Sequence, residues 1–302
     1  MFYQFEFCPY RRRFKQPLQT SHGIWEIREG IVIRLIDEMG KICLGEIAPI
    51  PWFGSETFSQ ALDFCHNLPS EITLNIISSI PANLPACQFG FESAIKLENQ
   101  TNIDRLSYSI LLPTGESAFS AIQEKLSQNI QQTHTFKYKI GVLPIETELS
   151  LFDRIVGILP KTTKLRLDAN GGLSLQMANR WLKICDRIPQ IEFLEQPLGI
   201  DYFPEILALS QQYKTPIALD ESVSNLARIQ DCYQQGWRSI FVIKPAICGF
   251  PSKLKKICKH YNLDTVFSSV FETEVGREAA LKLAAEIQIE PRAVGFGVEN
   301  FY

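Results

Sequence analysis

Four apolar runs in the second half of the chain each end in a charged residue. The charged residues are Asp168, Glu195, Asp220 and Lys244. They follow one another at intervals of about 25 residues, close to the length of one strand–helix unit of a (β/α) barrel. Because such a barrel presents its functional groups at the carboxyl ends of its strands, the pattern indicates an enzyme.

The three acidic residues of this set are candidate ligands of a divalent metal ion. Asp168, Glu195 and Asp220 supply three carboxylates, and no histidine or cysteine stands at an equivalent position, which argues against zinc. Mg²⁺ prefers oxygen ligands and leaves positions for water or substrate oxygens. A lone strand-end aspartate is often only a helix cap, and Asp168 has that alternative. Three acids in consecutive strands favour Mg²⁺ instead, and we expect Mn²⁺ to substitute for it.

The pair Lys137 and Lys139 is the second chemical feature. Both lie in the strand-like run 136–141, and residues two apart on a strand face the same side, here the barrel interior or its mouth. Two neighbouring ammonium groups beside a divalent cation favour loss of a proton from one of them, so Lys139 can serve as a general base near neutral pH. The alternative is a solvent-facing edge of the sheet. The four charged strand ends favour the catalytic interpretation.

The elements that must position these residues alternate from about residue 105 onward. Helical candidates lie between the strand candidates, for example at 118–131, 173–185 and 278–286. The strand candidates are 107–112, 136–140, 164–168, 191–195, 217–220, 239–244, 264–268 and one near 293–296. Eight strands alternating with helices predict an α/β protein with a TIM-like barrel, in which the last helix is missing or replaced.

Residues 1 to about 100 show a different order of elements. An alternating start, a strand at 31–36, a hairpin signal at 37–40 and a returning strand at 41–48 come first, and helices at 58–68 and 86–97 follow. Strands followed by helices predict a small α+β domain. We therefore divide the chain into an α+β domain at 1–100 and a barrel catalytic domain at 101–302.

Composition argues against several other classes of protein. The 302 residues are 45% hydrophobic and 21% charged, with a net charge of −3, as in an ordinary globular protein. Nucleic-acid binding at the basic run 11–13 is less favoured than a solvated turn between strands. No membrane span is apparent. The eight cysteines form no CxxC pair, so we expect reduced thiols and a cytoplasmic protein.

In order along the chain, the motifs are Lys-x-Lys, Leu-Arg-Leu-Asp-Ala-Asn-Gly-Gly, Glu-Gln-Pro, Leu-Asp-Glu-Ser and Ile-Lys-Pro. This ordered set resembles the enolase superfamily, in its muconate-lactonizing-enzyme subgroup, and the resemblance covers the whole chain. It implies an α+β capping domain and a (β/α)₇β barrel. It also implies Mg²⁺ held by Asp168, Glu195 and Asp220, with Lys139 and Lys244 on opposite faces of a small-molecule carboxylate substrate. Members abstract a proton α to a carboxylate and stabilise the resulting enediolate.

Within that subgroup the chain most resembles the dehydratases that form o-succinylbenzoate in menaquinone or phylloquinone biosynthesis. The serine-rich segment at 268–276 and the helix at 85–94 carry this finer likeness, which implies substrate contacts by Ser268 and Ser269. Two departures from the family pattern are Gln196, where many relatives have a second acid, and the Val-Phe-Glu-Thr sequence at 270–273. Lys244 is expected to stabilise the enediolate electrostatically.

The surrounding residues are assigned less directly. Lys137 is expected to tune Lys139. Lys137, Asn170 and Arg166 are expected to bind or surround the substrate, although Arg166 can equally be a structural residue of the barrel interior. Segments 20–23 and 53–56 are candidate lid loops, with ordinary turns as the alternative. None of the histidines, His22, His66, His134 and His260, stands at a strand end, and none is assigned to the chemistry.

Sibling reactions on the same residues remain open at this level. They are racemisation or epimerisation of N-acyl amino acids or dipeptides, and cycloisomerisation of a muconate, because all begin with the same proton abstraction. A non-catalytic barrel is disfavoured, since both lysines and all three acids are retained. The oligomeric state is not predicted.

Overall fold

A computed structural model describes residues 2–20, 23–96, 102–128 and 134–298. The chain separates into two compact units. The first comprises Met1–Ser107, Val223–Asp231 and Ile243–Tyr302, and the second comprises Tyr108–Ser222 and Cys232–Val242. The boundary predicted at residue 100 falls outside the described residues, and the two-domain division stays a prediction.

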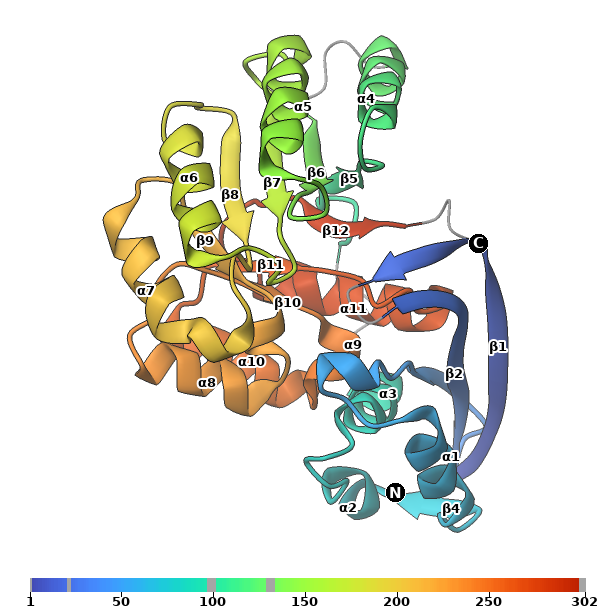
Figure 1. The fold of residues 1–302 in the computed structure, drawn as a ribbon. Coiled ribbons are helices and arrows are strands. Elements are labelled where there is room, and N and C mark those ends of the chain that lie inside the picture. Colours follow the sequence, from blue (N-terminus) through green and yellow to red (C-terminus); the bar gives the residue numbers. More distant parts are fainter. Residues whose placement is uncertain (1, 21–22, 97–101, 129–133, 299–302) are drawn as a thin grey trace. The chain divides into compact units, whose positions relative to one another are not determined.

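The first unit contains a four-stranded antiparallel sheet, of order β3-β2-β1-β4. Its strands are β1 (Phe2–Thr20), β2 (Gly23–Asp37), β3 (Ile42–Ile47) and β4 (Glu71–Thr73). Figure 1 shows β1 and β2 as a long pair. On β2 the alternating residues Ile31, Ile33 and Leu35 are fully buried, as the period of two along a strand requires. The predicted hairpin and its returning strand are confirmed.

Four helical segments of the same unit lie after β3, with β4 between the second and the third of them. They are η1 (Pro51–Phe53), α1 (Phe58–His66), α2 (Leu74–Ser78) and α3 (Pro85–Lys96). Thr57 and Gln60 form a reciprocal capping box at the start of α1. A side chain at Gly45 of β3 would collide with the carbonyl oxygen of Gly90 in α3, so glycine permits the close approach of strand and helix. The short β4 and α2 were not predicted.

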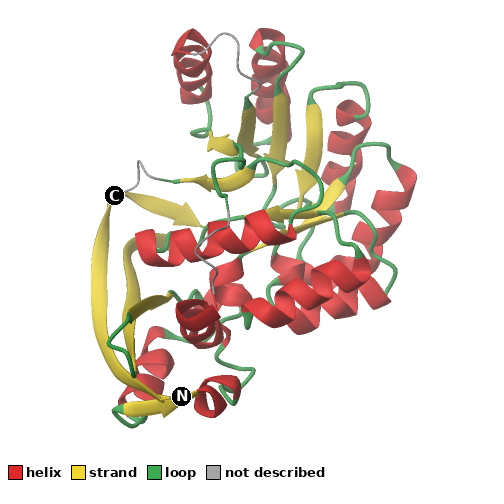
Figure 2. Cartoon of the chain, turned by 180° about the vertical axis from the view of Figure 1, so that it is seen from behind, coloured by secondary structure: helices red, strands yellow, loops and turns green. Residues whose placement is uncertain are grey.

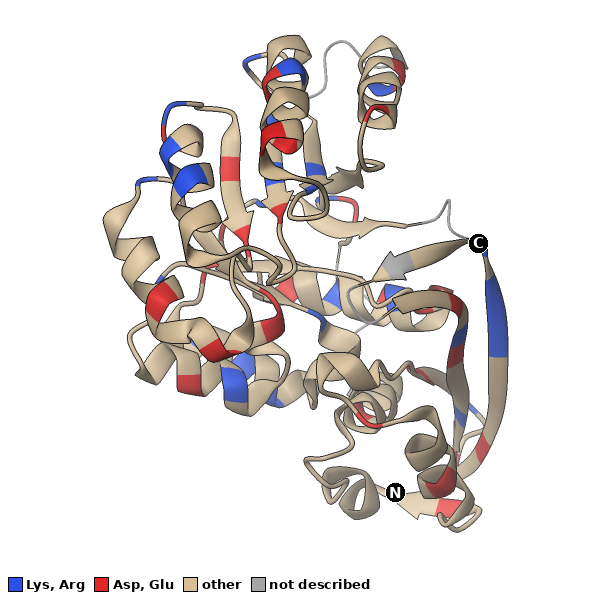
Figure 3. Cartoon of the chain, in the orientation of Figure 1, with Lys and Arg blue, Asp and Glu red and all other residues tan. Residues whose placement is uncertain are grey.

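The prediction of a turn at residues 11–13 is wrong. Arg11 and Arg13 lie inside β1, where they form ion pairs with Glu29 and Glu26 of β2. Figure 3 shows the basic stretch of β1. The pattern misled because this part of the strand is exposed, so it lacks the apolar alternation that marks a half-buried strand. Pairing with acids on the neighbouring strand stabilises it instead.

The second sheet has eight strands in the order β11-β10-β9-β8-β7-β6-β5-β12. A parallel bridge between Ser268 and Gly295 joins the two ends of this order, and the result is the predicted (β/α)₇β barrel. Figure 2 distinguishes its strands and helices by colour. The strands are β5 (Tyr108–Leu111), β6 (Thr135–Lys139), β7 (Lys164–Asp168), β8 (Ile191–Glu195), β9 (Ile217–Leu219), β10 (Ile240–Ile243), β11 (Thr265–Phe267) and β12 (Val294–Gly297).

Helical segments occupy all seven connections between these strands. They are α4 (Ser117–Gln128), α5 (Ile145–Ile158), α6 (Leu175–Cys185), η2 (Ile200–Tyr202), α7 (Phe203–Gln212), η3 (Glu221–Val223), α8 (Leu226–Gln234), α9 (Pro245–Cys248), α10 (Pro251–Tyr261) and α11 (Glu274–Ile287). All eight strand predictions are confirmed, with ends that differ by at most two residues. The last residues of the helices predicted at 86–97 and 118–131 lie outside the described part of the chain.

Two further findings bear on the composition. All eight cysteines are described, and each is a free thiol. None of the described helices has the length and apolar character that crossing a membrane requires.

Candidate active site

The carboxyl ends of β6, β7, β8 and β9 place the predicted polar residues at one level of the barrel. Lys139 is paired in register with Asp168, Asp168 with Glu195, and Glu195 with Ala218, two residues before Asp220. This arrangement follows from parallel pairing, because the carboxyl ends of adjacent parallel strands meet at the same edge. The structure therefore brings Lys139 and the three acids to adjacent strand ends, as predicted.

Lys137 forms two ion pairs with the predicted metal ligands. Its ammonium nitrogen lies 2.7 Å from Asp168 Oδ2 and 2.7 Å from Glu195 Oε1. Burial by itself lowers the pKa of Lys137, but the two carboxylates outweigh that effect and hold its pKa well above the usual lysine value. Lys137 is therefore a fixed cation. Its predicted role of tuning Lys139 stays a prediction.

The loop after β7 is tied to the loop after β9 through Asn170. The backbone N–H of Asn170 donates to Asp168 Oδ1 at 2.9 Å, and its side-chain amide donates to Glu221 Oε1 at 3.3 Å. Asn170 has φ of +42°, a left-handed conformation that asparagine tolerates better than most residues. Glu221 was not singled out from the sequence, although it directly follows Asp220.

Arg166 makes the contacts of a structural residue. It is 1% exposed, its Nε lies 2.7 Å from Glu192 Oε2, and its guanidinium carbon lies 4.8 Å from the centre of the Phe193 ring. Both contacts are with the neighbouring strand β8. These partners favour the structural alternative for Arg166, and its contact with substrate stays a prediction.

The donor set of the three acids suits a hard dication. Asp168, Glu195 and Asp220 are 7%, 1% and 3% exposed, so their carboxylates are removed from bulk water at adjacent strand ends. Among the described residues, however, no group of three or more His, Cys, Asp or Glu side chains is gathered as a formed metal site. The Lys137 ammonium lies between two of the three carboxylates. It contacts Asp168 Oδ2 and Glu195 Oε1, one oxygen of each carboxylate.

The remaining predicted residues belong to the first unit. Lys244 directly precedes α9, and its ammonium nitrogen lies 3.9 Å from the centre of the Phe53 ring, a cation–π contact. Phe53 was noted only as part of a candidate lid loop. The other loop, 20–23, includes residues 21 and 22 and so His22, which lie outside the described residues.

Ser268 and Ser269 follow β11 in the same unit. The Ser269 hydroxyl donates to Glu272 Oε2 at 2.9 Å and accepts from the backbone N–H of Phe271, while the N–H of Val270 also donates to Glu272. Burial, helped by the neighbouring Glu46 carboxylate, raises the pKa of Glu272 to about 7, although hydrogen bonds to its carboxylate act in the opposite direction. The buried Glu272 side chain therefore holds the 269–272 turn together by accepting these hydrogen bonds. Its role was not predicted.

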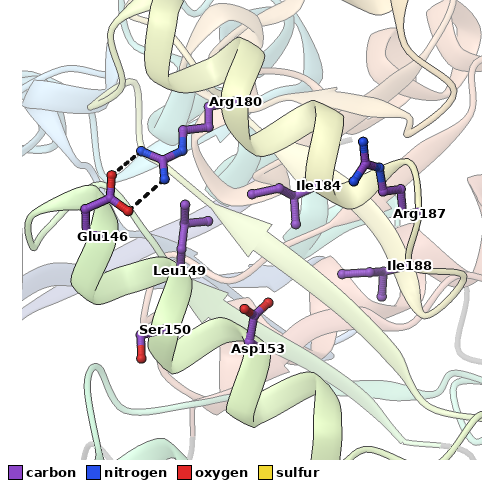
Figure 4. A pocket seen from close by; sticks show the side chains of 8 residues that line it. All are labelled: Glu146, Leu149, Ser150, Asp153, Arg180, Ile184, Arg187 and Ile188. Carbon is purple, nitrogen blue, oxygen red and sulfur yellow. Dashed lines mark hydrogen bonds and ion pairs between the residues drawn. The ribbon is translucent and has the colours of Figure 1, made fainter.

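A surface groove between α5 and α6 lies in the second unit (Figure 4). Its volume is about 650 Å³. The lining residues are Glu146, Leu149, Ser150, Asp153, Arg180, Ile184, Arg187 and Ile188. None of them is a candidate site residue, and Glu146 forms an ion pair with Arg180 across it. We attribute the chemistry to the strand ends, because that is where the buried charged groups meet.

Comparison with known proteins identifies the family of this chain. The family profile described as "Enolase C-terminal domain-like" matches residues 121–295. The o-succinylbenzoate synthase of Thermosynechococcus vestitus is 39% identical to this chain, over 97% of the chain and 91% of that protein. This chain belongs to the o-succinylbenzoate synthase family. A member of that family from Bacillus subtilis is 24% identical over 90% of the chain.

Solved structures agree with that family assignment. The crystal structure of the o-succinylbenzoate synthase from Thermosynechococcus elongatus, complexed with magnesium in its active site, superposes with a TM-score of 0.91. It is 37% identical and covers 99% of this chain and 94% of its own. The L-Ala-D/L-Glu epimerase of Bacillus subtilis superposes with a TM-score of 0.81 at 20% identity, covering 97% of this chain and 89% of its own, which shows a shared fold.

Proposed function

We propose that this chain is a Mg²⁺-dependent dehydratase that converts 2-succinyl-6-hydroxy-2,4-cyclohexadiene-1-carboxylate to o-succinylbenzoate and water, in menaquinone or phylloquinone biosynthesis. The observation that carries the proposal is the near full-length similarity to o-succinylbenzoate synthases at 39% identity. The charged residues at consecutive strand ends supply the groups that such a reaction needs. A cytoplasmic location is part of the proposal.

The metal is the first component of the proposed site. Asp168, Glu195 and Asp220 would hold Mg²⁺, whose positive charge stabilises negative charge that develops on the substrate carboxylate. The related Thermosynechococcus elongatus enzyme, which contains magnesium, supports this assignment. Mn²⁺ is proposed as a substitute.

The two further lysines have different roles in this proposal. Lys139 removes the proton on the ring carbon that bears the carboxylate, which leaves an enediolate. The carbon–oxygen bond of the neighbouring ring hydroxyl then breaks, the hydroxyl leaves as water with a proton returned by Lys139, and the ring becomes aromatic. Lys244 is a fixed cation that stabilises the enediolate, and its contact with the Phe53 ring restrains its position.

Substrate binding is assigned to groups around these lysines. We propose that Asn170, Ser268 and Ser269 orient the substrate, with Lys137 and Arg166 fixing the charged surroundings. The hydrogen bonds of Asn170 to Glu221 and of Ser269 to Glu272 support the first part, since they hold both side chains in defined orientations. The epimerase and muconate-cycloisomerase alternatives are supported by the shared fold alone. No contact of a described residue favours either of them.

A direct assay tests the proposed reaction. Purified wild-type enzyme with Mg²⁺ is mixed with the cyclohexadiene substrate, and aromatisation of the ring is followed by the change in ultraviolet absorbance. We expect turnover that stops in excess EDTA and returns when Mg²⁺ is restored. A parallel panel of N-acyl amino acids, dipeptides and muconate serves as the control. Turnover of panel compounds without turnover of the cyclohexadiene would reject the dehydratase proposal.

A further inference from the structure

Gln196, which follows β8, connects strand β9 to the loop after β7 through its backbone. Its N–H donates to the carbonyl of Ala218 in β9 at 2.8 Å, and its own carbonyl accepts from the N–H of Gly171, after β7, at 2.7 Å. It directly follows Glu195, the end of β8. The residue is therefore a backbone connection between the segments that carry Asp168, Glu195 and Asp220.

The side chain of Gln196 makes a second set of connections. Its Oε1 accepts from the backbone N–H groups of Asp220 at 3.0 Å and Ser222 at 3.2 Å. Its Nε2 donates to the Ser222 hydroxyl at 2.8 Å and to the carbonyl of Leu198 at 3.0 Å. An amide can accept with one end and donate with the other, as these four bonds require, whereas a carboxylate can only accept.

The conformation and burial of Gln196 show that these bonds determine its position. It is fully buried, and its φ of +35° lies in the left-handed region that non-glycine residues rarely adopt. Such a conformation is strained and persists only where the surroundings enforce it. Glycine would relieve this strain but would lose all four side-chain hydrogen bonds.

We propose that Gln196 is a positioning residue that sets the separation between the carboxylates of Glu195 and Asp220, and with it the affinity of the site for Mg²⁺. The inference rests on the proposed function, because it assigns Mg²⁺ to these carboxylates. Glu195 is fixed by the peptide bond it shares with Gln196, and Asp220 is fixed by the hydrogen bond from its N–H to Oε1. Residues that orient metal ligands in this way typically change metal affinity 10–100-fold when they are replaced.

The variant Gln196→Met tests this role. Methionine keeps the length and the apolar volume of the side chain but removes all four hydrogen bonds. Gln211→Met, at an exposed position in α7 of the same unit, is the matched control. The affinity for Mg²⁺ is measured by calorimetry on the enzyme without substrate, and the Mg²⁺ concentration for half-maximal activity is measured separately. We expect about tenfold weaker binding in Gln196→Met, no change in Gln211→Met, and recovery of most of the turnover at saturating Mg²⁺.

The outcomes separate the inference from the function on which it rests. A wild-type chain that binds no Mg²⁺ overturns both. Suppose that wild type binds Mg²⁺ and that Gln196→Met is less stable, but its affinity for Mg²⁺ falls less than threefold. Gln196 then only stabilises the fold, and the inference is wrong. Gln196→Asn keeps an amide but shortens its reach to Asp220 and Ser222. If Gln196→Met does not fold, Gln196→Asn is judged by the same threefold criterion.

Discussion

At the scale of single residues, Lys137 shows how the site balances its charges. Its ammonium group contacts both Asp168 and Glu195, which are buried and lie side by side in register. Removing one partner of a buried ion pair leaves uncompensated charge in a poorly hydrated site, which costs more than the pair itself contributes. The lysine therefore stabilises the fold in the absence of a dication, whatever its part in the reaction.

The ion pairs of Lys137 predict that Lys137→Met is less stable than wild type. The variant leaves two adjacent carboxylates without the ammonium group, so we expect it to be less stable than wild type by about 3–5 kcal/mol without metal. Mg²⁺ supplies the missing positive charge and should stabilise the variant more than wild type. Denaturant unfolding with and without Mg²⁺ measures both effects, and Lys161→Met at an exposed loop position is the control. A Lys137→Met chain as stable as wild type in EDTA would contradict this account.

The proposed division of labour between Lys139 and Lys244 gives a second prediction at this scale. Lys139→Arg keeps the positive charge but cannot lose a proton at working pH, so turnover should fall by at least about 10³-fold while Mg²⁺ binding is nearly unchanged. Lys244→Arg keeps a fixed cation and should be milder. Steady-state assays of aromatisation with calorimetry of Mg²⁺ binding measure the difference. Substantial activity in Lys139→Arg would show that another group is the base, and Lys244 would be the next candidate.

At the scale of elements, the loop between β11 and α11 depends on two buried acids. Glu46 of β3 accepts from the backbone N–H groups of Thr273 and Gly276, each at 2.8 Å, at the start of α11. Such contacts satisfy helix donors that lack partners and suit a negative charge. Glu272 lies beside it, 6% exposed, with Oε1 lacking a partner among the described residues. Burial first, and the Glu46 carboxylate second, raise the pKa of Glu272 and favour its protonated form.

The pKa of Glu272 predicts a pH dependence of stability. Its pKa is about 7 in the fold against 4.5 for the ordinary side chain. The folded state thus binds a proton that the unfolded state has lost, so this contribution is complete below about pH 4.5 and is lost as the pH rises through 7. The loss is at most about 3 kcal/mol. Denaturant unfolding between pH 5 and 8 should show this decline in wild type, and Glu272→Gln, which cannot ionise, should lack it.

The control for this prediction is Glu274→Gln, an exposed acid in the first turn of α11. It should retain the pH dependence of wild type. If Glu272→Gln and wild type lose stability in parallel over this range, a different group is responsible. Glu46 is the charged group that faces Glu272 from β3.

At the scale of the whole molecule, the barrel was predictable because its signals repeat. Asp168 and Glu195 were assigned to strand ends because each closes a buried run, and regular spacing makes such coincidences informative. The exposed part of β1 was missed because it carries no apolar period. The role of Gln196 was missed because its hydrogen bonds reach Asp220 and Ser222, which only the pairing of β8 with β9 brings near. Such contacts cannot be predicted from composition or from the spacing of residues along the chain.

Binding of Mg²⁺ affects the stability of the whole chain. A ligand that binds only the folded state stabilises it by RT ln(1 + [L]/Kd), about 2.7 kcal/mol at a concentration 100 times Kd. Mg²⁺ should therefore raise the melting temperature of wild type by several degrees, and Asp220→Ala or Glu195→Ala should abolish the rise. Asp153→Asn, which removes an exposed acid of the same unit, should keep it. Thermal melts in EDTA and in excess Mg²⁺ measure these shifts. If all three variants show the same rise in melting temperature, removal of a proposed ligand has no effect, and Mg²⁺ binds elsewhere.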